Sequence, residues 1–299
     1  AARCGAARMD FGEWATRLEL RCYGARVVRR YSGGFMARRM AMRFAAALLG
    51  TSFIYTAAVL APIGSALGAR AAEAAINTCP TPKTYVLTTV PATFKKNVAL
   101  TFDDGPSPKW TPQVLDILEA NHVRATFFMI GQNARANPSL VRRVLAEGHT
   151  IGNHSYSHPN LTTLSTTQQR ASMDNGTKYI SAAIEGGYKP CFFRPPYGSY
   201  NSTTINLARN RGMSVVKWSR NTKDWAAPSS LSTSFQKTIV ANATSPLSSH
   251  PNVIMHDGGP SAYRQNTVDS LQRIITFYKS RGYKFTNPAG VQEPRLQIQ

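Results

Sequence analysis

Short apolar runs alternate with amphipathic helical patterns from residue 97 to residue 286, and no other feature of the sequence constrains its fold as strongly. In residues 112–121, for example, the apolar residues recur on one side of a helix, with Thr111 as the expected cap. Gly148, Gly212 and Gly282 each follow a helical pattern and precede an apolar run, where a helix-ending glycine belongs. Such alternation is typical of one parallel α/β domain, either barrel-like or doubly wound.

These patterns predict seven strands and six helices. The expected strands are residues 97–102, 125–130, 149–153, 191–194, 214–218, 252–255 and 283–286. The expected helices are residues 112–121, 139–147, 166–184, 203–211, 231–243 and 268–281. In parallel α/β folds the functional groups gather at the carboxyl ends of the strands, and the polar motifs described below lie at such ends.

The residues before this domain differ from it in composition. Residues 1–43 contain ten arginines and three acidic residues, and we interpret them as a basic extension that need not be native. Residues 44–71 combine an apolar run with a stretch of small residues, which favours a secretory signal cleaved near Ala71 over a retained membrane anchor. We expect residues 72–96 to be an extended lead-in, residues 97–286 the α/β domain and residues 287–299 a C-terminal tail. The protein is then secreted or associated with a cell wall, with no stable membrane span after signal removal.

The formal net charge of the 299-residue chain is +20. Its cations are dispersed and form no basic helix with interleaved aromatic residues, so attraction to an anionic wall is a better interpretation than nucleic-acid binding. We expect a monomer with no nucleic-acid partner. Two cysteines, Cys79 and Cys191, fall after the signal. They can form a disulfide, as is common in exported chains, or Cys191 can be a buried free thiol.

Two adjacent carboxylates, Asp103 and Asp104, end the first expected strand. Turn chemistry alone can explain the sequence Asp-Asp-Gly-Pro. The alternative is functional, because a strand end can direct both side chains toward one cavity. One carboxylate would then bind a metal while the other remains free as a general base.

His154 and His158 follow the third expected strand and are four residues apart. They can be two surface histidines, or they can face one way and bind one metal ion if the chain turns helically. Together with Asp104 they provide two imidazoles and one carboxylate, which is the composition of catalytic zinc sites that keep a position open for water. Cobalt and nickel also suit these ligands. Such a metal lowers the pKa of bound water to about 7, and Asp103 could take its proton.

Three further motifs follow later strands. Arg194 precedes two prolines that rigidify a turn. If Arg194 lies beside Asp103, it would keep that carboxylate ionised. The backbone N–H of Tyr197, in the same turn, could point at an oxyanion. A proline-fixed loop with a surface salt bridge is the alternative. His256 lies where a general acid is needed, and Asp224 could hold one of its ring nitrogens. Trp225 could form a flat wall for a sugar ring, and Ile254 and Met255 could line a pocket for a methyl group.

Taken in order, these five motifs resemble those of the NodB-like polysaccharide deacetylases of carbohydrate esterase family four, and chitin deacetylases among them. The matching segments are TFDDGP at 101–106, HSYSHP at 154–159, RPPYG at 194–198, DW at 224–225 and IMH at 254–256. The resemblance spans residues 97–286. It implies a distorted (β/α) barrel of about seven parallel strands with a single catalytic domain.

The resemblance also implies a role for each site residue. Asp103 would be the catalytic base, with Asp104, His154 and His158 as metal ligands, Arg194 steadying the base, Tyr197 donating its backbone N–H to the oxyanion, and His256 acting as the acid assisted by Asp224. Two positions depart from the family pattern. Asn221 stands where an aspartate is frequent, which could weaken the charge around His256. Ile254 replaces a leucine, which should only reshape the acetate pocket.

The function implied is the removal of N-acetyl groups from GlcNAc units, with chitin or chito-oligosaccharide preferred over peptidoglycan as the substrate. The cofactor would be a divalent metal, with zinc preferred. One alternative is an O-deacetylase acting on acetylxylan, which would pass through the same oxyanion. A second alternative, from another class, is a non-catalytic protein that binds wall glycans through a decayed site.

Overall fold

The structure is a computed structural model that describes residues 22–23, 26–27, 79–184, 187–259 and 263–292. The chain divides into two compact units, residues 1–59 and 60–299. In the first unit the described residues form two short antiparallel strands, β1 (Cys22–Tyr23) and β2 (Arg26–Val27). The rest of the expected extension 1–43, the whole of the expected signal 44–71 and residues 293–299 of the expected tail lie outside the described residues.

The second unit is built on a curled parallel sheet whose strand order is β7-β6-β5-β4-β3-β9-β8, with β10 paired to β3. This half-barrel confirms the expected distorted (β/α) barrel of about seven parallel strands. The strands are β3 (Asn97–Asp103), β4 (Thr126–Met129), β5 (Thr150–Asn153), β6 (Phe192–Phe193), β7 (Ser214–Val215), β8 (Arg220–Asn221), β9 (Asn252–His256) and β10 (Lys284–Phe285).

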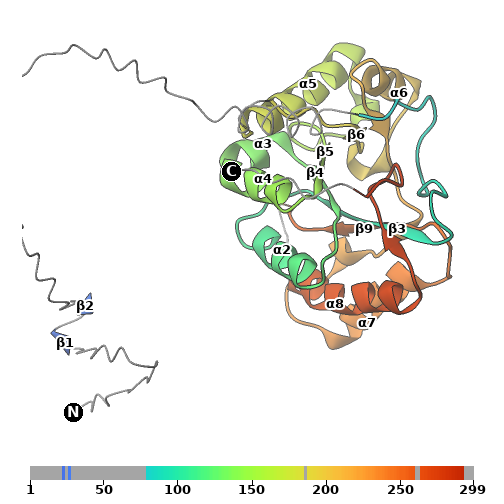
Figure 1. The fold of residues 1–299 in the computed structure, drawn as a ribbon. Helices are drawn as coiled ribbons and strands as arrows, with labels where there is room; N and C mark the ends of the chain where they lie inside the picture. The colour runs from blue at the N-terminus through green and yellow to red at the C-terminus, as the bar shows by residue number, and fades with distance from the viewer. Residues whose placement is uncertain (1–21, 24–25, 28–78, 185–186, 260–262, 293–299) are drawn as a thin grey trace, which may run out of the picture. The chain divides into compact units, whose positions relative to one another are not determined.

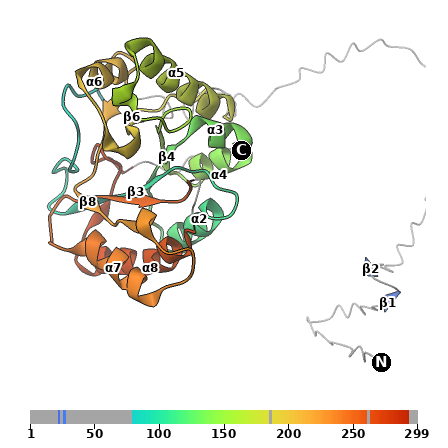
Figure 2. The same cartoon turned by 180° about the vertical axis from the view of Figure 1, so that it is seen from behind.

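Seven helices are described around this sheet. Figure 1 shows α2, α7 and α8 together on one side of the strands and α5 and α6 at the opposite end, and Figure 2 shows the same grouping from behind. The helices are α2 (Thr111–Ala120), α3 (Gly131–Ala136), α4 (Pro138–Ala146), α5 (Thr166–Ala182), α6 (Ser202–Arg209), α7 (Thr233–Thr244) and α8 (Gln265–Ser280). Three short 3₁₀ turns are η1 (Leu161–Thr163), η2 (Pro196–Gly198) and η3 (Asp224–Ala226).

The expected helices and strands are found within a few residues of their predicted positions, but α3 and β8 were not predicted. Both are short and polar, so they carry no apolar periodicity. Thr111 is not the cap of α2 as expected. Trp110 is the N-cap and makes no capping hydrogen bond with its side chain, while Thr111 is the first helical residue. The Thr111 hydroxyl has other partners, which are described below.

The core lies between the strands and the helices that cover them. Alternate residues of β3 and β4 pack outward against α2 and α8, and the rings of Phe102 and Phe127 stack with their centroids 5.2 Å apart. Leu115 and Leu271 of the two helices belong to the same fully buried cluster. Burying each such side chain contributes about 1.5–3 kcal/mol. The opposite residues of β3, Thr101 and Asp103, are left to face the inside of the curled sheet.

A disulfide joins Cys79 to Cys191, across a sequence separation of 112 residues. Of the two alternatives for these cysteines, the structure therefore shows the disulfide. The lead-in continues along the edge of the sheet, where Leu87 forms a parallel bridge with Val216 just after β7. Farther on, Thr93 donates a hydrogen bond to the carbonyl of Gly290 at 2.6 Å, so the two ends of the described domain are tied to each other. None of the helices in the described part of the chain is long and apolar enough to span a membrane.

Candidate active site

The site is built at the carboxyl end of β3. Asp103 is the last residue of this strand and is in register with His256 at the end of β9. Asp104 follows with a left-handed φ of 72°, so the chain turns there instead of continuing the strand. The carboxylates of Asp103 and Asp104 are both buried.

Asp104, His154 and His158 come together with their ligand atoms within 4.8 Å of one another. Asp104 Oδ1 lies 3.5 Å from His154 Nε2 and 3.4 Å from His158 Nε2, and this oxygen is buried without a hydrogen-bond partner. His154 Nδ1 lies 2.7 Å from the carbonyl oxygen of Arg194, to which it can only donate, so its Nε2 is left with a lone pair. Burial alone would raise the pKa of Asp104, but the neighbouring imidazoles of His154, His256 and His158 hold this pKa far below its ordinary value. An unpartnered carboxylate oxygen facing two imidazole nitrogens fits a divalent cation, and these ligand types suit zinc, cobalt or nickel.

Arg194 is buried and ion-paired with Asp103. Its Nη1 donates to Asp103 Oδ1 at 2.6 Å and to Thr101 Oγ1 at 2.8 Å. Its Nη2 donates to the carbonyl of Lys217 at 2.9 Å, and its guanidinium lies 4.0 Å from the ring centroid of Phe128. Burial lowers the pKa of Arg194, and the Asp103 carboxylate opposes this effect. The charge of Asp103 is therefore matched by a fixed cation, as a buried ion pair requires.

Unusual backbone conformations concentrate around these residues. Six residues other than glycine have positive φ in the described part of the chain, and Asp104, Ser155, His158 and Tyr197 are four of them. Such conformations cost about 1–3 kcal/mol each and cluster at functional sites. Tyr197 lies in η2 with φ 60°, and its ring packs edge-on against His158 at a centroid distance of 4.5 Å. Tyr197 is 68% exposed.

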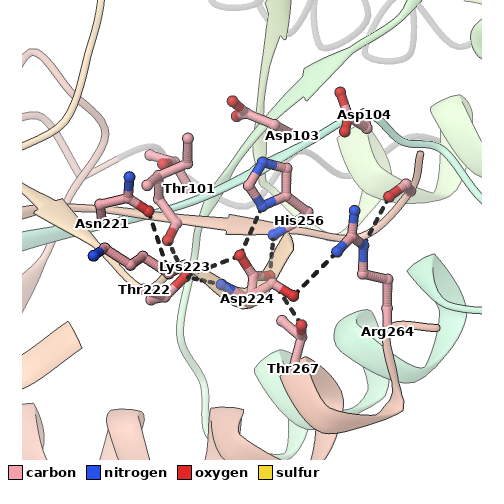
Figure 3. A network of polar contacts seen from close by, with 12 residues as sticks. Thr101, Asp103, Asp104, Asn221, Thr222, Lys223, Asp224, His256, Arg264 and Thr267 are labelled. Carbon is pink, nitrogen blue, oxygen red and sulfur yellow. Dashed lines mark hydrogen bonds and ion pairs between the residues drawn. The ribbon is translucent and has the colours of Figure 1, made fainter. Parts of the chain in front are cut away.

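His256 is held by Asp224, which lies at the centre of the polar network in Figure 3. Asp224 Oδ1 accepts from His256 Nδ1 at 2.7 Å, and Oδ2 accepts from the backbone N–H of His256 at 2.8 Å. Burial alone would lower the pKa of His256, but the Asp224 carboxylate raises this pKa above the ordinary histidine value. Burial alone would raise the pKa of the Asp224 carboxyl. The charge and the hydrogen bond of His256 nevertheless hold this pKa below its usual range. Figure 3 also places Asp103 and Asp104 beside the His256 ring.

Three neighbours complete the Asp224 network, and the sequence had not identified them. Thr267 donates to Asp224 Oδ2 at 2.9 Å, Thr222 donates to Oδ1 at 3.0 Å, and Arg264 donates to the Asp224 carbonyl at 3.2 Å. Thr267 lies in α8 and Arg264 just before it, with no local pattern that marks either as part of a site. Asn221 caps the turn that leads to Asp224 by accepting from the N–H of Lys223 at 2.9 Å.

Of the residues expected to bind substrate, not all face the site. Trp225 is 58% exposed in η3, directly after Asp224. Ile254 is in register with Thr101 and shares the face of β9 that carries His256. Met255 points to the other face and belongs to the main hydrophobic core with Phe102. The structure thus brings Ile254 to the site but not Met255, because consecutive residues of a strand alternate between faces.

The fold is a distorted (β/α) barrel. A carboxylate–histidine cluster, an arginine-paired acid and an aspartate-paired histidine lie together at one end of its sheet, and such a combination is typical of a hydrolase. Comparisons with known proteins agree. The polysaccharide deacetylase family model matches residues 91–216. A peptidoglycan-N-acetylglucosamine deacetylase of Bacillus cereus is 38% identical over 192 residues, which cover 64% of this chain and 66% of that protein.

Two further relatives are matched over a larger share of their own length than the Bacillus protein is. A chitooligosaccharide deacetylase of Sinorhizobium fredii is 33% identical over 208 residues, covering 66% of this chain and 93% of its own length. A crystal structure of a peptidoglycan N-acetylglucosamine deacetylase, in complex with an N-oxidanyl-benzamide, superposes with a TM-score of 0.62 at 34% identity, covering 70% of this chain and 93% of that one. The chain belongs to the polysaccharide deacetylase family, the NodB-like carbohydrate esterases.

Proposed function

We propose that this protein is a metal-dependent hydrolase that removes N-acetyl groups from a GlcNAc-containing polysaccharide outside the cell. One observation carries the proposal. The Asp104–His154–His158 cluster lies at the same strand ends as a base candidate paired with Arg194 and an acid candidate paired with Asp224. Hydrolysis of an amide by water needs a base that takes a proton from the water and an acid that gives one to the leaving amine.

The three ligands would hold one divalent cation, with zinc preferred because two imidazoles and one carboxylate match open catalytic zinc sites. The cation would supply Lewis acidity toward the acetyl carbonyl and lower the pKa of a water molecule. His154 is oriented for this role by its Nδ1–H bond to the Arg194 carbonyl, since the partner of one ring nitrogen fixes the tautomer at the other.

The protein side chains would then move two protons. Asp103, aimed by its ion pair with Arg194, would take a proton from the attacking water. The backbone N–H of Tyr197 would donate to the developing oxyanion. His256, protonated through its pairing with Asp224, would give a proton to the leaving amine. Each role is assigned from the geometry of this site together with the resemblance of its motifs to the family.

The choice of substrate rests on the relatives. The Bacillus protein is named for peptidoglycan GlcNAc and the Sinorhizobium protein for chito-oligosaccharide, and the GlcNAc N-acetyl group is common to both. We propose the N-acetyl group of GlcNAc as the target, with peptidoglycan tested alongside the chito-oligosaccharide that the sequence analysis preferred. Exposed Tyr197 and Trp225 would contact the sugar rings at the mouth of the site. A secreted or wall-associated location agrees with either polymer.

The test is a substrate panel with acetate detection. Chitopentaose, peptidoglycan glycan strands and acetylxylan are each incubated with metal-stripped protein and with the same protein after zinc is restored. We expect zinc-dependent acetate release from at least one GlcNAc polymer and less from acetylxylan. Release from acetylxylan alone would reassign the protein as an O-deacetylase. Tight glycan binding without acetate release in the presence of metal would show a binding protein instead.

A further inference from the structure

Asp257 is a buried carboxyl group for which the proposed mechanism has no use. It follows His256 at the end of β9, and its backbone N–H donates to the carbonyl of Asp103 at 3.1 Å. Its Oδ2 accepts from the Thr111 hydroxyl at 2.5 Å, while its Oδ1 is buried without a hydrogen-bond partner. Burial raises the pKa of Asp257 to about 7, with a further contribution from the charges of Asp104 and Asp103. A polar group in such surroundings is costly to keep and calls for an explanation.

The Asp257 carboxyl occupies the space beneath the turn that follows Asp104. A Cβ atom at Gly105 would overlap this carboxyl group, and a Cβ atom at Gly258 would overlap the Asp104 carbonyl. Both glycines are therefore required for the close approach of the two segments. The end of β9 and the turn after β3 are in direct contact at this place, directly behind a proposed metal ligand.

Thr111 extends the contact along the turn. Its hydroxyl donates to Asp257 and accepts from the backbone N–H of Ser107 at 2.7 Å. From the other side, Asn133 Nδ2 donates to the Asp104 carbonyl at 2.7 Å and the N–H of Ile130 donates to the Gly105 carbonyl at 3.0 Å. The left-handed backbone of Asp104 is thus held from two directions, which is how a strained conformation persists.

We propose that Asp257 is a positioning residue that acts through Thr111 to fix the turn 104–107, so that the Asp104 carboxylate is aimed at His154 and His158 before a metal binds. This inference rests on the metal site of the proposed function. A single role for Asp257 then explains three observations. Its carboxyl is fully buried, the Thr111 hydroxyl bonds to both Asp257 and Ser107, and residues 105 and 258 are glycines. The competing explanation is a polar contact that serves only the stability of the fold.

Metal affinity separates these two explanations. Three variants are compared with the wild type: Asp257→Ala, Thr111→Val and the double variant. Their zinc Kd is measured by chelator competition on folded, metal-stripped protein. Unfolding midpoints are measured on the same samples. We expect each single variant to weaken zinc binding about tenfold, the size typical of groups that orient metal ligands. The double variant should be close to the weaker single variant, because both remove the same hydrogen bond. Asp257→Asn keeps an oxygen that accepts from Thr111 and should retain most of the affinity.

Tyr278→Phe is the matched control, because it removes a buried hydroxyl that donates to the Ala243 carbonyl at 2.6 Å, between α8 and α7. It should lower the unfolding midpoint and leave the zinc Kd unchanged. If Asp257→Ala and Thr111→Val lower only the midpoint, as the control does, the inference is wrong while the metal site stands. If Asp257→Ala does not fold, Thr111→Val decides alone, since valine has nearly the shape of threonine. A wild-type chain that binds no zinc, cobalt or nickel overturns the proposed function and this inference together.

Discussion

Asp103 and Asp104 are consecutive in the chain, and both carboxylates face Nε2 of His154, at 3.8 Å and 3.5 Å. Neighbours in a regular strand would point to opposite faces, but the left-handed φ of 72° at Asp104 turns the chain so that both side chains reach one site. Arg194 binds the remaining oxygen of Asp103, whereas His158 approaches Asp104. Replacing the two acids should therefore have different effects.

Asp103→Asn should retain zinc binding and lower kcat by about 10²–10⁴-fold, which is the usual contribution of a general base. The variant leaves Arg194 without its ion-pair partner, and breaking a buried pair costs about 3–5 kcal/mol, so the folded fraction must be measured first. Acetate release and zinc content are measured on the same sample. Asp116→Asn, an exposed change on α2, is the control. Unchanged acetate release by folded Asp103→Asn would contradict the role of Asp103.

His154→Ala should lose both zinc and activity. In the wild type, removal of metal by a chelator should abolish acetate release, and zinc should restore it. Because zinc binds the folded chain, zinc at 100 times its Kd should raise the free energy of unfolding by about 2.7 kcal/mol. Denaturant unfolding with and without zinc measures this gain. A wild-type curve that zinc does not move, or a His154→Ala curve that moves equally, would argue against the cluster.

Activity should fall as the pH rises through the pKa of His256, because the imidazolium is the form that donates a proton. Asp224 raises this pKa, so the fall is expected above the ordinary histidine range. Asp224→Asn removes the raising charge and should move the basic limb of the kcat/KM profile to lower pH, in addition to lowering its maximum. By linkage, the stability from this raised pKa is fully present below the unfolded-state pKa of His256 and is lost as the pH rises through the folded-state value. A basic limb that Asp224→Asn leaves in place would assign it to another group.

Replacing both Cys79 and Cys191 by serine should lower the free energy of unfolding by about 2–5 kcal/mol, since the bridge closes a long loop. Zinc affinity and kcat of the folded variant should stay close to wild type, because neither cysteine is a proposed metal ligand, base or acid. Chemical denaturation and acetate release measure the two effects. Intact mass should rise by two daltons when the wild type is reduced (one disulfide). An unchanged mass would contradict the bridge.

Much of the site could be predicted because parallel strands bring their carboxyl ends to one edge of the sheet. Asp104, His154 and Arg194 are far apart in sequence but follow β3, β5 and β6, so their convergence follows from the order of the elements. The strands themselves were recognisable because they are apolar. β8 was missed because Arg220 and Asn221 are polar, and tertiary pairing with β9 alone makes them a strand.

The sequence by itself determined the class of fold, the positions of the polar motifs and the candidate ligands, because periodicity and side-chain chemistry are local properties of the chain. Only the tertiary structure decided which face each residue takes and what lies behind it. Met255 packs in the core although Ile254 beside it faces the site, and Thr111 bonds to Asp257 although it lies 146 residues away. Such contacts depend on strand register and on close backbone approach between distant segments, which no local pattern encodes.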